Sequence, residues 1–121
     1  MAYALTNFAK NKMLDPTGAG LASFALYASL HTALPDSSGS NEASGGTPAY
    51  ARQAITWGTA VGGIVQATNM PIFDVPAGTY AFGGLWGDPT AGNFCGYAEF
   101  SSPFEPSGQD TFNMTSILVS L

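Results

Sequence analysis

The sequence predicts a mainly β fold, a single antiparallel β-sandwich of jelly-roll-like type with a short N-terminal helix. Three observations predict it. Short stretches of alternating apolar and polar residues recur along the chain, Gly- and Pro-containing turns separate them, and no period of roughly 20–50 residues repeats. A length of 121 residues is typical of one domain, so we expect residues 1–121 to form one. Within it we expect a helical arm over 1–18 and a long surface loop over 34–48.

The helix is predicted from the stretch that begins at residue 5. Thr6 has the side chain of a helix cap, and Asp15-Pro16 followed by Gly18 should end the helix after about two turns. Phe8 should pack on the body of the domain, because so short a helix is stable only when something packs on it.

Strands are expected wherever apolar residues alternate with polar ones or with small ones. The expected strands are 24–31, 50–57, one or two within 62–75, 79–86, 93–100 and 111–121. The segment 79–100 is the best hairpin, because two aromatic-rich strands flank the turn 87–92, "GDPTAG". Further turns are expected over 76–78 and 106–108. The last strand carries apolar residues on both faces, which indicates a central strand covered on both sides.

Four titratable residues have ordinary structural interpretations. His31 should lie at the end of a strand on its more polar face, at the surface or hydrogen-bonded. Asp36 and Glu42 stand in the long loop and are interpreted as solvated acids, because neither calcium-loop spacing nor an apolar pocket accompanies them. Cys95, the single cysteine, has apolar and aromatic neighbours and is predicted to be a small buried hydrophobe.

Composition excludes several classes of function. Three basic residues against eight acidic ones, a net charge of −5, cannot supply the phosphate contacts of a nucleic-acid-binding protein or attract an anionic membrane. We expect no signal peptide, because the first lysines follow the apolar residues, and no apolar run of about 20 residues occurs in the sequence. One cysteine and one histidine make no metal site, and no phosphate loop or Gly-x-Ser-x-Gly motif occurs. We therefore predict no catalytic residue, no cofactor and no metal, and do not expect an enzyme.

Arg52, the only arginine, stands in the middle of an expected strand. Its guanidinium is suited to a forked contact with a carboxylate or with backbone carbonyls. Three roles are open: a pair within the chain, with Asp74, Asp88 or Glu99 for instance, a contact with another subunit or the capsid, and, least favoured, catalysis. The first, structural role is the prediction.

Several segments together carry a family likeness. They are "LTNFAKNKMLD", "FALYASLHTALP", "NEASGG", "YARQAITW", "MPIFDVPAGTYAFGGLWGDPTAGNF", "GYAEFSSPFEPSGQDTF" and "ILVSL". In this order they resemble a family of small tailed-bacteriophage virion proteins, often labelled phage tail fibre proteins. Similar small β-domains occur as head decoration, or cement, proteins. The likeness covers nearly the whole chain, and its most specific pieces are residues 50–54 and the aromatic hairpin.

The resemblance implies a virion structural protein, made in the host cytoplasm. The leading hypothesis is a head decoration protein that binds the major capsid protein and stabilises the outside of the shell, as a homo-oligomer and by family likeness a trimer. The alternatives are a tail or tail-fibre component that contacts tail proteins, or a carbohydrate-binding sandwich with an exposed Trp57, Trp86 or Tyr80. The side chains expected to contact partners are Tyr3, Phe8, Glu42, Tyr50 and Arg52.

Overall fold

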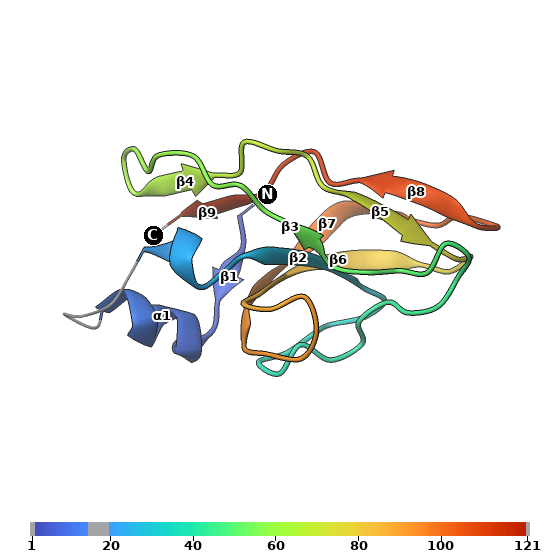
Figure 1. Ribbon diagram of the computed structural model, residues 1–121, viewed down its shortest axis with the longest axis horizontal. Helices are drawn as coiled ribbons and strands as arrows, with labels where there is room; N and C mark the ends of the chain where they lie inside the picture. The colour runs from blue at the N-terminus through green and yellow to red at the C-terminus, as the bar shows by residue number, and fades with distance from the viewer. Residues whose placement is uncertain (1, 15–19, 121) are drawn as a thin grey trace.

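A computed structural model describes residues 2–14 and 20–120 of the chain. In chain order its elements are β1 (Ala4–Leu5), α1 (Asn7–Leu14), a 3-10 turn (Leu21–Ser23), β2 (Tyr27–His31), β3 (Gln53–Ala54), β4 (Ile64–Gln66), β5 (Ile72–Val75), β6 (Tyr80–Trp86), β7 (Phe94–Phe104), β8 (Asp110–Asn113) and β9 (Leu118–Ser120). The pairs between these strands are all antiparallel. The prediction of a mainly β, antiparallel, sandwich-like fold with one short helix is confirmed (Figure 1).

One layer is a five-stranded sheet in the order β1-β7-β6-β2-β3. Its centre is the predicted aromatic hairpin, β6 with β7, whose turn lies between Trp86 and Phe94 as expected. The turns expected over 76–78 and 106–108 also lie between strands. By contrast, the strand expected over 50–57 pairs with β2 only at Gln53 and Ala54.

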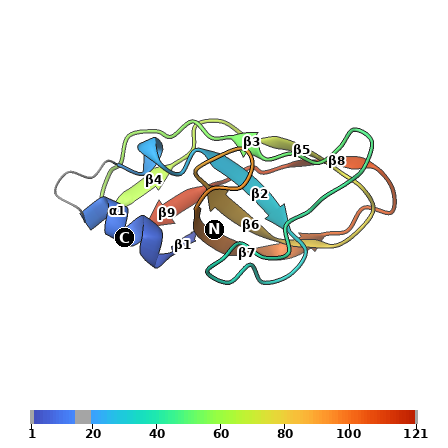
Figure 2. The same cartoon turned by 60° about the horizontal axis from the view of Figure 1, so that its bottom comes forward.

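The second layer is one long, bent ribbon. Its two pieces, β4 with β9 and β5 with β8, lie end to end along the long axis of the molecule (Figures 1 and 2). Hydrogen bonds continue between the pieces, from the N–H of Ala67 to the carbonyl of Ile117 (2.9 Å) and from the N–H of Met114 to the carbonyl of Pro71 (2.9 Å). The segments 64–75 and 110–120 therefore run beside each other over nearly their whole lengths.

Two strands pass from one layer to the other and close the sandwich at one end. On one side, Tyr3 donates to the carbonyl of Leu118 in the ribbon (2.8 Å), and Ala4 and Leu5 then pair with β7 in the sheet. On the other side, Gln53 and Ala54 pair with β2, and Thr56 then accepts a hydrogen bond from Thr68 in the ribbon. Such closure leaves few free strand edges at that end.

The last strand was expected to be central because both its faces are apolar, and the structure gives a different reason. Phe112 and Met114 face inward in its first part, whereas Ile117 and Val119 are buried in its second. The inward parity switches because the pairing is offset by one residue: Ile72 faces Asn113, but Gln66 faces Leu118. Apolar residues occur on both faces of this segment because the pairing in the ribbon is irregular, and not because the strand is covered on both sides.

The polar face assigned to the strand 24–31 is also buried. Ser29 and His31 are as inaccessible as Ala28 and Leu30 on the opposite face. The loop after β2 folds over this face, and the ring of Phe94 packs edge-on against His31 at 5.7 Å between centroids. His31 is therefore hydrogen-bonded, as one expectation had it, but lies inside the protein.

The N-terminal helix α1 begins where the sequence predicts. Thr6 accepts a hydrogen bond at its Oγ1 from the N–H of Ala9 (3.3 Å) and donates one to the carbonyl of Phe94 (2.9 Å), so it caps the helix and ties it to β7. Phe8 is half-buried against the core. The predicted stop at Asp15-Pro16 and Gly18 lies outside the described residues. No helix among those described is long and apolar enough to span a membrane.

Replacing Gly39 with alanine tests how tightly the loop after β2 packs on the sheet. A Cβ at Gly39 would lie 2.5 Å from Cη2 of Trp86 and 2.9 Å from Phe94, and the backbone φ is +77°. We expect Gly39→Ala to lower the free energy of unfolding by about 3 kcal/mol or more, from strain and overpacking together. Urea denaturation followed by Trp fluorescence measures it.

Gly45→Ala is the matched control, because φ is +82° there but no atom lies within 4 Å of the added carbon. We expect it to cost about 1–2 kcal/mol, the price of the backbone conformation alone. Equal losses in the two variants would contradict the proposed packing.

Candidate functional site

The side chain of Arg52 is held from three directions. Its Nε and one terminal nitrogen donate to the two carboxylate oxygens of Glu42, each at 2.8 Å. Its other terminal nitrogen donates to the backbone carbonyls of Asp88 (2.9 Å) and Ala91 (2.8 Å). The guanidinium carbon stands 3.6 Å from the centre of the Trp86 ring, a stacked cation–π contact. Only 8% of the side chain is exposed.

These contacts answer what the single arginine does. Arg52 fastens the turn between β6 and β7, through the carbonyls of Asp88 and Ala91, to the loop after β2, through Glu42. The prediction of an intrachain pair is confirmed, but the expected acids were wrong: the partner is Glu42, and Asp88 takes part through its backbone carbonyl. Glu42 was interpreted as a solvated loop acid, which is also wrong, whereas Asp36 is exposed as expected.

Tyr50 completes the environment of Glu42. Its hydroxyl donates to Oε2 of Glu42 (2.8 Å) and accepts from the N–H of Leu30 (3.1 Å), and its ring stacks on Phe73. Burial, together with the nearby charge of Glu42, raises the pKa of the Tyr50 hydroxyl. The phenol is therefore neutral and serves as a hydrogen-bond donor.

A second polar chain lies beneath the Trp86 ring. Nδ1 of His31 lies 2.8 Å from the carbonyl of Ser40, which only accepts, so the proton must be on Nδ1. Nε2 then accepts from the hydroxyl of Ser29 (2.7 Å), and that same oxygen accepts from Nε1 of Trp86 (3.0 Å). Burial is the main cause that lowers the pKa of His31. Gly84 leaves space for this chain, since a Cβ there would stand 2.6 Å from Nε2.

This arrangement has little chemistry to offer. The arginine, the carboxylate, the tyrosine and the histidine are all engaged with one another or with the backbone. Cys95 is fully buried, as predicted, and burial raises the pKa of its thiol to about 11, so it is a poor nucleophile. Within residues 2–14 and 20–120, no group of three His, Cys, Asp or Glu residues is placed to hold a metal ion.

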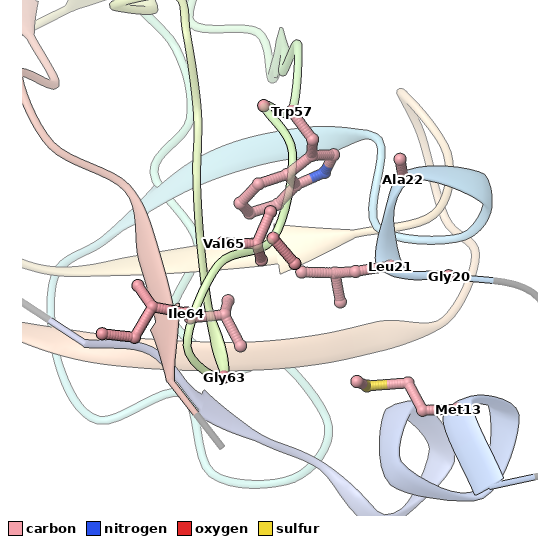
Figure 3. A pocket seen from close by; sticks show the side chains of 11 residues that line it. Met13, Gly20, Leu21, Ala22, Trp57, Gly63, Ile64 and Val65 are labelled. Atoms are coloured by element: carbon pink, nitrogen blue, oxygen red, sulfur yellow. The ribbon is translucent and has the colours of Figure 1, made fainter.

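A separate apolar pocket of about 310 Å³ opens beside the helix and the hairpin that leads into β4. Figure 3 shows Trp57 above Leu21 and Val65, and Met13 on the helix below them. The tip of the same hairpin is apolar and outward-facing, with Val61 at 75% exposure. Among the residues that the structure describes, no charged side chain lines the pocket, and this lining suits an apolar group.

The five predicted partner-contact residues fall into three places. Glu42, Tyr50 and Arg52 meet in one cluster. Phe8 lies on α1, half-buried, and Tyr3 is buried with its hydroxyl donating to the sulfur of Met114 (3.3 Å). That any of the five contacts another chain stays a prediction.

Two of the three aromatic residues considered for sugar binding are buried. Trp86 and Tyr80 are buried, at 7% and 3% exposure. Trp57 is half-buried, and its ring N–H donates to the carbonyl of Ala25 (2.7 Å). Trp86 and Tyr80 therefore offer no open ring face on which a sugar could stack, whereas part of the Trp57 ring lines the apolar pocket.

Three members of the cluster were not predicted from the sequence. They are Trp86 as the surface under the guanidinium, Ser29 as the bridge between Trp86 and His31, and Gly84 as the space beside them. A signal was present, because adjacent glycines in mid-strand, Gly83 and Gly84, indicate that other groups approach the backbone closely.

Comparison with models of protein families gives a match over nearly the whole chain. The model of a family described as Podophage GP4 fiber I protein gp80 matches residues 4–120. No curated protein matches the chain.

The first test of the cluster is the replacement Arg52→Lys. Lysine keeps the charge but loses the fork onto Glu42, the two carbonyl contacts and the stack on Trp86. We expect the free energy of unfolding to fall by about 2–3 kcal/mol, somewhat less than removal of a fully buried partner costs. Urea denaturation measures the loss. Lys10→Arg, on the exposed side of α1, should change stability by less than about 0.5 kcal/mol, and a similar effect of both would refute the clamp.

The second test is the pH dependence of stability. The pKa of His31 is lower in the folded chain than the value near 6.5 of the unfolded one, so below about pH 6.5 the unfolded state binds more protons. Stability should therefore decline as pH falls from about 6.5 towards the folded pKa, before ordinary carboxylates titrate near pH 4. Urea denaturation midpoints, measured at intervals of about half a pH unit between about pH 7.5 and about pH 5, would show this decline in stability.

His31→Asn is the matched variant, because an amide is able to donate to the carbonyl of Ser40 without titrating. We expect a less stable protein whose stability is nearly flat over the same range. A slope equal to that of the parent chain would assign the effect to other groups.

Proposed function

Because the chain belongs to the podophage GP4 fiber I protein gp80 family, we propose that this phage virion structural protein is a fibre component of the tail. The observation that carries the proposal is the family match over residues 4–120, nearly the whole chain. The head decoration role that the sequence favoured is the competing location on the particle.

The architecture supports a structural role and not an enzymatic one. Four side chains hold the loops to the sheet and give a rigid unit: those of Arg52, Glu42, Tyr50 and His31. The surface is poor in Lys and Glu, and exposed apolar side chains such as Val61, Met70 and Ile72 remain on the ribbon side. Protein–protein interfaces share these features. We propose other tail subunits as partners, and copies of the chain arranged as a homotrimer.

The number of copies per virion tests the proposed location. Quantitative mass spectrometry of purified particles, with the major capsid protein as internal standard, should find a handful to a few tens of copies, in multiples of three if the trimer is right. Gold-labelled antibody should decorate the tail in electron micrographs. A ratio to the capsid protein near one to one, or a simple fraction such as one to three, with label on the head, would overturn the fibre role in favour of head decoration.

A further inference from the structure

Residues 34–41, called the lid from here on, fold into a small unit over one face of the five-stranded sheet. The hydrogen bonds of the lid are largely internal. The N–H of Ser40 donates to the carbonyl of Pro35 (2.8 Å), and the side-chain amide of Asn41 donates to the carbonyl of Leu34 (3.0 Å). Most residues of the lid are exposed. A loop that is bonded mainly to itself can move as one body.

Gly39 and Ser40 of the lid lie on this face of the sheet. The carbonyl of Ser40 accepts from Nδ1 of His31 (2.8 Å). Gly39 lies against Phe94 and against the edge of the Trp86 ring, where an added Cβ would collide with Cζ2, the ring atom beside the carbon that carries Nε1. The lid therefore separates the imidazole of His31 and the indole N–H of Trp86 from solvent.

His31 fits these surroundings only while its imidazole is neutral. Nδ1 donates to the lid, Nε2 accepts from the hydroxyl of Ser29 (2.7 Å), and the oxygen of Ser29 accepts from Nε1 of Trp86 (3.0 Å). A proton taken up from solvent turns Nε2 into a donor, so the hydroxyl hydrogen of Ser29 loses its acceptor. Among the described residues no buried side-chain N or O atom lacks a partner. Protonation would introduce such an atom together with a buried charge, and both are unfavourable.

The lid is the part of this environment that can move most easily. All five residues of β2 pair with β6, which fixes the backbone of His31, and β6 pairs in turn with β7, which carries Phe94. The lid lies between β2 and β3, outside both strands. Glu42 follows the lid directly, and it is bridged to His31 and bound by Arg52, so the chain stays attached while the lid opens. Segments with few contacts open before the rest of a protein.

His31 is the group here whose charge changes between about pH 7.5 and about pH 5.5, because carboxyl groups ordinarily titrate near pH 4 and a guanidinium above pH 12. Burial is the main cause that lowers the pKa of His31; the hydrogen bond to Ser40 and the charge of Glu42 raise this pKa, and the charge of Arg52 lowers it. The other titratable or charged side chains on this face and in the segments that cover it are Asp36, Glu42, Tyr50, Arg52, Asp88, Tyr97 and Glu99.

The sign of the pH effect follows from the two environments of the imidazole. Opening of the lid returns it to water, where its ordinary pKa is near 6.5. The pKa of His31 is lower in the closed state, so below about pH 6.5 the open state binds more protons and the open fraction rises as the pH falls. Between about pH 7.5 and about pH 5.5, this linkage raises the ratio of open to closed molecules about five- to tenfold.

We propose that residues 34–41 are a lid that acid releases: they cover His31 and the edge of the Trp86 ring while the imidazole is neutral, and they move away when Nε2 gains a proton. Opening exposes an aromatic surface, formed by the Trp86 edge and the Phe94 ring, and closure buries it again when the pH rises. This inference goes beyond the proposed fibre role and does not depend on it, so either can fail without the other.

Solvent exchange of the Trp86 indole N–H, followed by NMR on the full chain, measures the opening, because Nε1 lies beneath the lid. Its protection relative to a free indole should fall about five- to tenfold from about pH 7.5 to about pH 5.5. At about pH 5.5 this protection should be at least about tenfold lower than that of the backbone N–H groups of β6, and it should hardly change in urea below the unfolding transition.

Two results in the parent chain would overturn the proposal. If the Trp86 indole N–H and the N–H groups of β6 exchange with equal protection and equal dependence on urea, the whole chain unfolds and no lid opens. If the protection of the indole N–H is the same at both pH values, the lid is not released by acid.

Two variants identify the group that takes up the proton. In His31→Asn the amide is able to donate to Ser40 without titrating, and the protection of the Trp86 indole N–H should change less than about twofold over the same range. Asp36→Asn is the matched control: Asp36 is the acid within the lid, and asparagine tolerates its positive φ of 53°. This control should keep the full pH response. A full response in His31→Asn, or a flat one in Asp36→Asn, would overturn the assignment. The parent chain and Asp36→Asn decide the question even if His31→Asn does not fold.

Discussion

The forked contact between Arg52 and Glu42 is the interaction on which most of the non-repetitive structure depends. The loop from residue 32 to residue 52 has almost no strand pairing of its own, and the turn between β6 and β7 projects from the sheet. One guanidinium joins both of them to the ring of Trp86. Two further hydrogen bonds hold the same loop: the Tyr50 hydroxyl accepts from the N–H of Leu30 in β2, and His31 donates to the carbonyl of Ser40. A chain with few charges thus uses one cation to order two loops.

A buried ion pair of this kind contributes more to the choice of one conformation than to the free energy of unfolding. Desolvation of two ions offsets much of their attraction, so a well-packed apolar replacement of both is often no less stable. The forked geometry, however, is satisfied in one arrangement only, and Arg52 adds two carbonyls and a ring face to it. The cluster therefore specifies where the loops lie, which is what a subunit that must fit its neighbours requires.

Local patterns in the sequence predicted local structure well. Thr6 marks the cap of α1, and the "GDPTAG" turn marks the central hairpin, because each depends on residues near one another in the chain. The sandwich-like class followed from the same alternation. The partner of Arg52 could not be predicted, because Glu42 looked like any polar residue in a Ser- and Gly-rich loop. His31 was expected on a polar face because alternation cannot reveal that a loop will cover it. The apolar residues on both faces of the last strand were misread because one offset in pairing, between residues 114 and 117, switches the buried parity.

The closure by residues 2–5 also has a consequence for the order in which the protein folds. This first strand lies between β7 and β9, so both of its neighbours belong to the last quarter of the chain. During synthesis it lacks these partners until the residues of β7, and after them those of β9, have been made. Native topologies dominated by such distant pairings form slowly, since the loop must close before any contact rewards it. The N-terminal strand therefore remains unpaired until β7 has been made. A chain that ends before β9 lacks the second of its two partners.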